Sequence, residues 1–544
     1  MRRRTGTPQV LALTLLLVSG SAGAVAPVPR RPLPPTPQPV TPEIATTRHQ
    51  VTIGRRVLRY TARAGFLPIR HNETGEVHGQ MFFIAYLLDQ APGAPPRPLT
   101  FLWNGGPGAN SVLVHLIGFG PKRLRWKRDL ADEAGCDLVT NETTWLDLTD
   151  LVFVDPVGTG FSRPTRSEYA AEFYNTLGDI ASVAEFVRVY LTRFDAWDAP
   201  LVLGGESYGV WRAAGVAEAL LQRGIPVAGV ILISGGIPVG PVMPEEMRTA
   251  LFIPSRTAAA FYHRKLPPDL QTDLASALAQ AETWARTEYA PALARRDHLT
   301  DEQRERIVNG LARYTGIAPS LIDRKTLVIP RQQFVEQLLA GEKKVLARFD
   351  TRQIRGSEPD IHTRCGLTIN RYLRQTLNVA TDLAYQGIEE GFSPPGERPL
   401  SVNARWVYNQ APPPPPGTPL NTDAPPGGSQ PWLRRAMQMA PAVKVFVATG
   451  LYDSLNSCAV HAEVISRLEP PLRQNITARC YEGGHAMYET ESVREPLKRD
   501  ISAFYRDVVA GHRAGASRSG AFRQSRASSF DRRRSITRAG WMRR

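Results

Sequence analysis

Residues 205–209 have the sequence Gly-Glu-Ser-Tyr-Gly, which is the pattern G-x-S-x-G with a serine at its centre. In this pattern the serine lies on a sharp turn between a strand and a helix, and the glycines let the backbone pass closely without a side-chain clash. The flanking residues agree, because 199–204 form a short apolar run suited to a buried parallel strand and 211–221 are suited to a helix. We therefore expect Ser207 to project from a strand–turn–helix unit.

Further apolar runs predict the other strands of a sheet. They are residues 99–103, 151–154, 201–203, 227–234 and 443–448. Helical patterns separate several of these runs, as in α/β domains with parallel strands. Residues 49–88 instead alternate apolar and polar side chains between turn signals, which predicts antiparallel strands at one sheet edge. The expected fold is α/β with a mostly parallel central sheet.

The alternation of predicted strands and helices stops between residues 236 and 440. The chain of 544 residues is long enough for one large domain with insertions. Helix-like segments replace the alternation at 269–289, 301–314 and 331–349. We interpret 236–440 as a helical cap inserted between two parts of one core, 48–235 and 441–508. A proline-rich loop, 411–431, is expected to return the chain to the sheet, and a polyproline partner site is the alternative.

The first 24 residues resemble an export signal, with Arg2 to Arg4, an apolar run over 10–18 and a small-residue cleavage site at Ala22-Gly23-Ala24. The apolar run is about half of the ~20 residues that span a bilayer. We expect a secreted or periplasmic protein without a stable membrane anchor, and an uncleaved anchor is the alternative. Residues 25–47 are rich in proline and are expected to form an extended leader.

The formal net charge of +15 does not indicate a nucleic-acid-binding protein. Ten arginines against one acidic residue lie in 511–544, and three more arginines lie in the signal segment. The remaining chain is close to neutral. Residues 509–544 are therefore expected to form a basic, disordered tail.

A serine hydroxyl is a poor nucleophile until an imidazole can take its proton and a carboxylate orients that imidazole. In the α/β-hydrolase order the acid and then the histidine follow the serine, on loops after later strands. Asp453 follows the predicted strand at 443–448, and His485 follows a strand candidate at 476–481 beside two glycines. These two residues are the expected partners of Ser207. His115 and His461 remain weaker alternatives to His485.

Several ordered motifs together resemble the serine carboxypeptidase family. They are residues 103–108 (Trp-Asn-Gly-Gly-Pro-Gly), 155–162 (Asp-Pro-Val-Gly-Thr-Gly-Phe-Ser), 205–209, the segment around Asp453, and Gly484-His485. The resemblance covers residues 48–505 apart from the cap. It implies an α/β-hydrolase fold and the removal of one C-terminal amino acid from peptides, with no metal or organic cofactor.

The resemblance also implies roles for single residues. Ser207 would be the nucleophile, His485 the general base and Asp453 its orienting acid. The backbone N–H groups of Gly106 and Tyr208 would form the oxyanion hole, as expected for one donor after the nucleophile and one on an earlier loop.

The same resemblance assigns the recognition of the substrate's free C-terminus to three groups: the Asn104 side chain, the Gly105 N–H and the Glu206 carboxyl. A carboxyl beside a carboxylate must share a proton with it, so binding is expected to favour acid pH. A structural turn is the alternative for Asn104 and the glycines. Glu206 has a purely structural alternative as well.

The chain departs from the family at several positions. Ala109 stands where many members have a cysteine, and Gly118 stands where they have a glutamate two residues before a Gly-Pro pair. One family disulfide and a second carboxyl beside Glu206 are therefore absent. The histidine motif, residues 485–488, is His-Ala-Met-Tyr and resembles bacterial members.

Four cysteines in an exported chain suggest disulfides, and four cysteines allow three pairings. We favour Cys458 with Cys480, because both lie beside segments that converge if the catalytic assignment holds. Cys136 would then pair with Cys365. Buried free thiols are the alternative.

Three functions from different classes remain. The favoured one is a secreted serine carboxypeptidase that acts on peptides with a free C-terminus through an acyl-enzyme. An esterase or acyltransferase could use the same triad, since that machinery serves any acyl group. A catalytically silent binding protein is the third. The sequence leaves the side-chain preference and the oligomeric state open.

Overall fold

The computed structural model describes residues 43–126, 135–356, 361–387, 401–409 and 430–513. Its main sheet has ten strands in the order β1-β2-β3-β7-β4-β9-β10-β11-β12, with β8 paired to β3. The strands are β1 (Ala45–Ile53), β2 (Arg56–Arg70), β3 (Val77–Leu88), β4 (Leu99–Trp103), β7 (Asp150–Asp155), β8 (Arg163–Pro164), β9 (Leu201–Glu206), β10 (Gly229–Ile233), β11 (Lys444–Gly450) and β12 (Ile476–Tyr481). A separate pair is formed by β5 (Lys122–Trp126) and β6 (Cys136–Thr140).

The sheet changes from antiparallel to parallel at β7. Strands β1, β2, β3 and β7 pair antiparallel, whereas β7, β4, β9, β10, β11 and β12 form one parallel series. Every residue of β4, β9 and β10 is buried, because a parallel sheet is covered on both faces. This is the α/β-hydrolase fold expected from the sequence.

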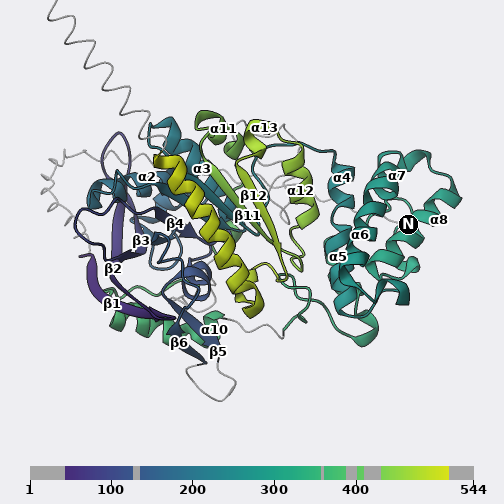
Figure 1. Ribbon diagram of the computed structural model, residues 1–544, viewed down its shortest axis with the longest axis horizontal. Helices are drawn as coiled ribbons and strands as arrows, with labels where there is room; N and C mark the ends of the chain where they lie inside the picture. The colour runs from purple at the N-terminus through teal and green to yellow at the C-terminus, as the bar shows by residue number, and fades with distance from the viewer. Residues whose placement is uncertain (1–42, 127–134, 357–360, 388–400, 410–429, 514–544) are drawn as a thin grey trace, which may run out of the picture. The chain divides into compact units, whose positions relative to one another are not determined.

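Helices cover both faces of the sheet (Figure 1). One face packs against α2 (Thr176–Phe194), α3 (Gly209–Gln222), α11 (Trp432–Met439) and α12 (Cys458–Ser466). The other packs against the π-helical segment η1 (Leu113–Phe119), α10 (Ile361–Arg371) and a helix over 491–513. Successive side chains of a strand point to opposite faces, so Leu201 and Leu203 enter the first core and Val202 the second.

A third core belongs to a cluster of helices between residues 250 and 346. Its main helices are α5 (Ile253–Tyr262), α6 (Leu274–Trp284), α7 (Ala290–Ala294), α8 (Asp301–Thr315) and α9 (Arg331–Gln337), and α4 (Glu245–Ala250) precedes them. This cap is narrower than the expected 236–440, because α10 and α11 pack on the sheet and contribute to its cores. The helical pattern of a sequence shows that one face of a helix is apolar. It does not show which part of the protein that face packs against.

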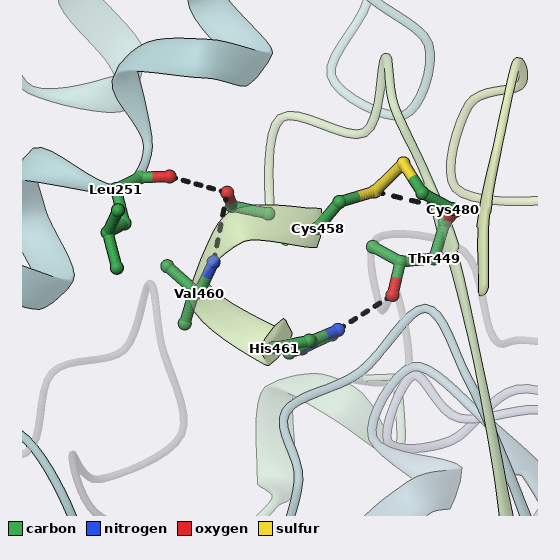
Figure 2. Close-up of a disulfide and its surroundings, with 7 residues drawn as sticks. Leu251, Thr449, Cys458, Val460, His461 and Cys480 are labelled. Atoms are coloured by element: carbon green, nitrogen blue, oxygen red, sulfur yellow. Dashed lines mark hydrogen bonds between the residues drawn. A yellow bond between two sulfur atoms is a disulfide. The ribbon is translucent and has the colours of Figure 1, made fainter. Parts of the chain in front are cut away.

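Two disulfides join Cys458 to Cys480 and Cys136 to Cys365, with Cα–Cα distances of 5.7 and 5.2 Å. These are the two pairs expected from the sequence, and both distances lie in the usual range. Figure 2 shows the first, which joins the start of α12 to β12. Next to this disulfide in sequence, Ser457 donates a hydrogen bond to the carbonyl of Leu251, which lies between α4 and α5 of the cap.

The ends of the folded part differ slightly from the expected boundaries. Strand β1 begins at Ala45 rather than at residue 48, and the last helix continues to residue 513, past the expected start of the tail at 509. The expected signal peptide, most of the leader, the proline-rich loop up to residue 429 and the tail from 514 lie outside the described residues. Within the described ranges, no helix is long and apolar enough to cross a membrane.

The turn between β9 and α3 leaves no room for side chains at its glycines. A Cβ at Gly205 would lie 1.9 Å from the carbonyl oxygen of Gly209, and a Cβ at Gly209 would lie 2.9 Å from the Trp103 ring. Ser207 itself has φ +58°, in the left-handed region that side chains other than glycine rarely adopt. The two glycines of G-x-S-x-G are thus required by the backbone geometry of the turn.

Replacing Gly205 by alanine is expected to lower the free energy of unfolding by about 3 kcal/mol, because its Cβ would collide with backbone rather than with a movable side chain. Urea unfolding would measure the change. Gly236→Ala is the matched control, since a Cβ there meets nothing within 4 Å. Equal destabilisation by the two substitutions would contradict this account of the turn.

Candidate active site

Ser207, the expected nucleophile, is half-buried at the carboxyl end of β9. Its backbone N–H donates to the carbonyl of Ile233 in β10 at 2.8 Å, and its carbonyl accepts from the N–H of Val210 at 3.1 Å. A left-handed serine costs of order 1–3 kcal/mol and persists only where its surroundings hold it. These two hydrogen bonds and the tight glycines hold the serine in that conformation.

Asp453 and His485 lie on the loops that follow β11 and β12. These strands are parallel neighbours, so their carboxyl ends bring the two loops together. The Asp453 Oδ2 and His485 Nδ1 atoms are 2.8 Å apart, and both side chains are buried. Asp453 also accepts hydrogen bonds from the Leu455 N–H at 2.8 Å and from the Asn456 amide at 2.7 Å. The carboxylate is therefore fixed on both oxygens.

The other ring nitrogen of His485, Nε2, is buried and has no hydrogen-bond partner among the described residues. With Nδ1 bonded to Asp453, Nε2 is the nitrogen that can take a proton. Burial alone would lower the pKa of His485, but the charge and hydrogen bond of Asp453, with a further contribution from Glu206, raise it above its ordinary value. The protonated form of His485 is therefore stabilised by these two carboxylates.

The acid loop is tied to the serine turn. The Asn456 amide that binds Asp453 also donates to the carbonyl of Ser234 at 2.9 Å, directly after Ile233, which accepts from Ser207. Glu206, the residue before Ser207, lies close enough to His485 for its charge to raise the pKa of that histidine. The structure thus gathers the serine turn, Asp453 and His485 at the carboxyl ends of β9, β11 and β12.

The expected oxyanion-hole residues lie on two adjoining segments. Gly105 packs against the start of α3, since a Cβ there would lie 2.5 Å from the Tyr208 backbone nitrogen. Gly106 follows with φ +97°, a backbone conformation suited to glycine. Within the described part of the chain, neither the Gly106 nor the Tyr208 N–H donates a hydrogen bond. Two unused amides beside the serine turn are the groups an oxyanion would need.

Asn104 and Glu206 are in direct contact, and both are buried with 2% of their surface exposed. The Asn104 amide donates to Glu206 Oε2, while its own carbonyl side-chain oxygen accepts from the Val114 N–H at 3.1 Å. The Tyr488 hydroxyl donates to the same Oε2 at 2.6 Å. Burial raises the pKa of Glu206 above its ordinary value, although His485 and the Tyr488 hydrogen bond act in the opposite direction.

A buried ion pair supports this corner of the site and was not foreseen from the sequence. Arg212 in α3 bonds Asp179 in α2 through Nε at 2.8 Å and donates from Nη1 to the Asn104 backbone carbonyl at 2.8 Å. The Tyr208 hydroxyl donates to Asp179 at 3.1 Å. The available signal was a single arginine five residues after Ser207, in the mostly apolar first half of the helix that follows the serine turn.

The two alternative histidines take other positions. His115 is buried in η1 and bonds the Tyr86 hydroxyl at 2.7 Å, and burial lowers its pKa to about 3. His461 bonds the Thr449 hydroxyl at 2.6 Å, as Figure 2 shows, and burial lowers its pKa to about 4. Among the described residues neither makes a hydrogen bond to a carboxylate. His485 is the histidine with the geometry of a general base.

A loop that follows α9 reaches the site from the cap. The Phe349 carbonyl accepts from the His485 N–H at 2.6 Å, and the two rings lie 5.2 Å apart between centroids. Phe349 is nevertheless 47% exposed, so its ring is an apolar surface beside the histidine. The helix expected over 331–349 is shorter, since α9 ends at Gln337 and the chain continues through the 3₁₀ turn η7 (Ala340–Glu342) to Phe349.

Residues 55–224 match a protein-family model described as serine carboxypeptidase. The pheromone-processing carboxypeptidase KEX1 of Tuber melanosporum is 31% identical over 163 residues, which are 29% of this chain and 23% of that protein. Its counterpart in Saccharomyces cerevisiae is 29% identical over 170 residues, covering 29% of this chain and 22% of that protein. The matched segments thus span less than a quarter of these curated relatives.

Solved structures with a similar course include a prohormone-processing carboxypeptidase from Saccharomyces cerevisiae, with a TM-score of 0.44 and 16% identity over 82% of this chain and 91% of that chain. A thermophilic esterase from Thermogutta terrifontis has a TM-score of 0.33 and 12% identity, over 82% and 98% of the two chains.

The family match contains the glycine loop at 104–108 and the serine turn at 205–209, and it ends before Asp453 and His485. Residues 55–224 of this chain are thus similar to the serine carboxypeptidase family.

Proposed function

We propose that this protein is a secreted serine carboxypeptidase that releases the C-terminal amino acid from peptides. The observation that carries the proposal is the Asp453–His485 hydrogen bond, which leaves His485 Nε2 unbonded beside the turn that carries Ser207. Asn104 and Glu206, in contact next to that turn, supply a group for a free C-terminus. Two disulfides suit an oxidising compartment, as does the export signal expected at residues 1–24.

The proposed reaction has two halves. Ser207 Oγ attacks the carbonyl carbon of the last peptide bond while His485 Nε2 takes the hydroxyl proton, and Asp453 stabilises the resulting imidazolium. The carbonyl oxygen becomes an oxyanion bound by the Gly106 and Tyr208 N–H groups. The C–N bond then breaks, and His485 gives its proton to the leaving amine. Water, activated by the same histidine, hydrolyses the acyl-enzyme and restores the serine.

Recognition of the C-terminus rests on a shared proton. The Asn104 amide and the Gly105 N–H would donate to the substrate carboxylate, and protonated Glu206 would donate a third hydrogen bond. If Glu206 loses its proton, two carboxylates face one another in a buried site, which disfavours binding. Burial already raises the pKa of Glu206, so the protonated form persists above the ordinary value of 4.5.

The first test compares an N-blocked dipeptide with its C-terminal amide. Release of the terminal residue is expected to be at least about tenfold faster from the free acid, because the amide lacks the carboxylate that the site binds. Ser207→Ala is expected to reduce the rate about a million-fold, and a fluorophosphonate probe should label the native protein but not this variant. Cleavage of simple esters without release from the dipeptide would favour the esterase alternative. An unlabelled native protein would favour a silent binding protein.

The second test is the pH dependence of kcat/KM on two substrates. For the free-acid peptide, kcat/KM is expected to fall as pH rises through the raised pKa of Glu206, because deprotonation places a second negative charge beside the substrate. An ester without a terminal carboxylate is expected to show only the rise through the pKa of His485, since the base must be neutral. Steady-state assays from pH 4 to 9 would measure both.

Glu206→Gln serves as the matched variant, because glutamine can donate a hydrogen bond but does not titrate. It is expected to remove the alkaline fall for the peptide and leave the ester profile in place. A fall that persists in Glu206→Gln would assign the titration to another group.

A further inference from the structure

Tyr488 contacts Glu206 from the far side of the histidine loop. It belongs to the 3₁₀ turn η10 (Met487–Glu489), three residues after His485, and 1% of its surface is exposed. Its hydroxyl donates to Glu206 Oε2 at 2.6 Å. Asn104 donates to the same oxygen, so both donors lie on Oε2 and, among the described residues, Oε1 accepts no hydrogen bond. The carboxyl therefore has one bound oxygen and one unbound oxygen.

The tyrosine is itself held in place from three sides. Its ring packs on Gly118, where an added Cβ would lie 3.4 Å from the ring, and it meets the Phe119 ring edge-on at 5.0 Å between centroids. Its backbone carbonyl accepts from Arg494 at 3.0 Å. Arg494 is anchored in turn by Asn141 at 2.6 Å. The hydroxyl position is thus set by residues that belong to the core and not to the cleft.

The charged and titratable groups that face Glu206 are few. His485 and Tyr488 approach it from the loop after β12, and Asp453 approaches from the loop after β11. The hydrogen bond from Tyr488 favours the ionised form of Glu206, as does the His485 charge, while Asp453 disfavours it. Removal of the Tyr488 hydroxyl alone would therefore favour the protonated form.

We propose that Tyr488 is a positioning residue that binds Glu206 Oε2 and so presents Oε1 as the oxygen that shares a proton with the substrate's terminal carboxylate. This inference rests on the proposed function and deepens it. The hydrogen bonds from Asn104 and Tyr488 fix the rotation of the Glu206 carboxyl group. The proton of its acid form therefore lies on Oε1. Tyr488 also sets the pH at which that proton is lost.

Tyr488→Phe tests the inference, since it deletes the hydroxyl and keeps the ring. At low pH the KM for the free-acid peptide is expected to rise about tenfold with kcat little changed, a loss in the range of one hydrogen bond between neutral groups. The alkaline fall of kcat/KM is expected to move to higher pH by about one unit, because the ionised form of Glu206 has lost a donor. Kinetics on the ester should be unchanged.

Tyr505→Phe is the matched control, because it removes a buried tyrosine hydroxyl that bonds Thr100 at 2.7 Å in the core. It is expected to leave both KM and the pH profile of the peptide as in the native enzyme. Site-specific 3-fluorotyrosine at position 488 adds a test that preserves the hydroxyl and the packing. Its more acidic phenol is a stronger donor and should move the alkaline fall to lower pH.

Three results would overturn the inference. The first is an unshifted alkaline fall in both position-488 variants, and the second is an equal loss on peptide and ester, which would mark Tyr488 as structural. The third is a native enzyme without preference for the free acid over the amide. That outcome would overturn the proposed function first, and the role of Tyr488 with it, so the two failures are distinguishable.

Discussion

The buried pair of Arg212 and Asp179 is the interaction on which the geometry of this site depends. Its members have 0% and 2% of their surface exposed, and they connect α3 to α2 beneath the serine turn. Arg212 also donates to the Asn104 carbonyl and Asp179 also accepts from the Tyr208 hydroxyl, so one ion pair orients both the glycine loop and the first residue after the serine. Removing one member of such a pair commonly costs 3–5 kcal/mol, because the other charge stays buried without compensation. The proposed site for a substrate terminus and the proposed oxyanion hole thus share the same support.

Much of the fold could be predicted because parallel strands are buried on both faces and therefore appear as short apolar runs. Strand β4 was expected at 99–103 on this ground and lies there, fully buried. Strand β12 was also expected at 476–481 and lies there, although it is a partly exposed edge strand. Asp453 and His485 could be nominated because each follows a predicted strand, and the structure brings their side chains to 2.8 Å from one another. Their catalytic roles remain proposals. Side-chain partnerships across long separations could not be predicted, and Tyr488 with Glu206, 282 residues apart, is the clearest case.

The departures from the family pattern have a physical counterpart in the structure. Gly118, which stands where many family members have a glutamate, leaves the space against which the Tyr488 ring packs. A phenol donates a hydrogen bond as a carboxylic acid does, but burial raises its pKa well above 10, so it keeps its proton at every pH at which a peptidase works. Within the described residues, Glu206 is then the single carboxyl at this position that titrates. The site has one titrating acid where the family pattern implies two.

The cap has its own hydrophobic core, formed by residues between 250 and 346, so its helices pack separately from the sheet. Substitutions inside that core change the packing of the cap helices with each other, while the sheet and its serine turn keep their own contacts. The segment after α9 contacts the site through the Phe349 carbonyl on the His485 N–H, the Arg348 carbonyl on Ser454 and the Thr351 N–H on the Tyr452 carbonyl. On the cap side these three groups are backbone atoms, and a backbone contact tolerates many side chains. An insertion with its own core can vary in sequence while the sheet and the serine turn keep their packing. Such changes would alter the surface beside His485 and leave the support of Ser207 in place.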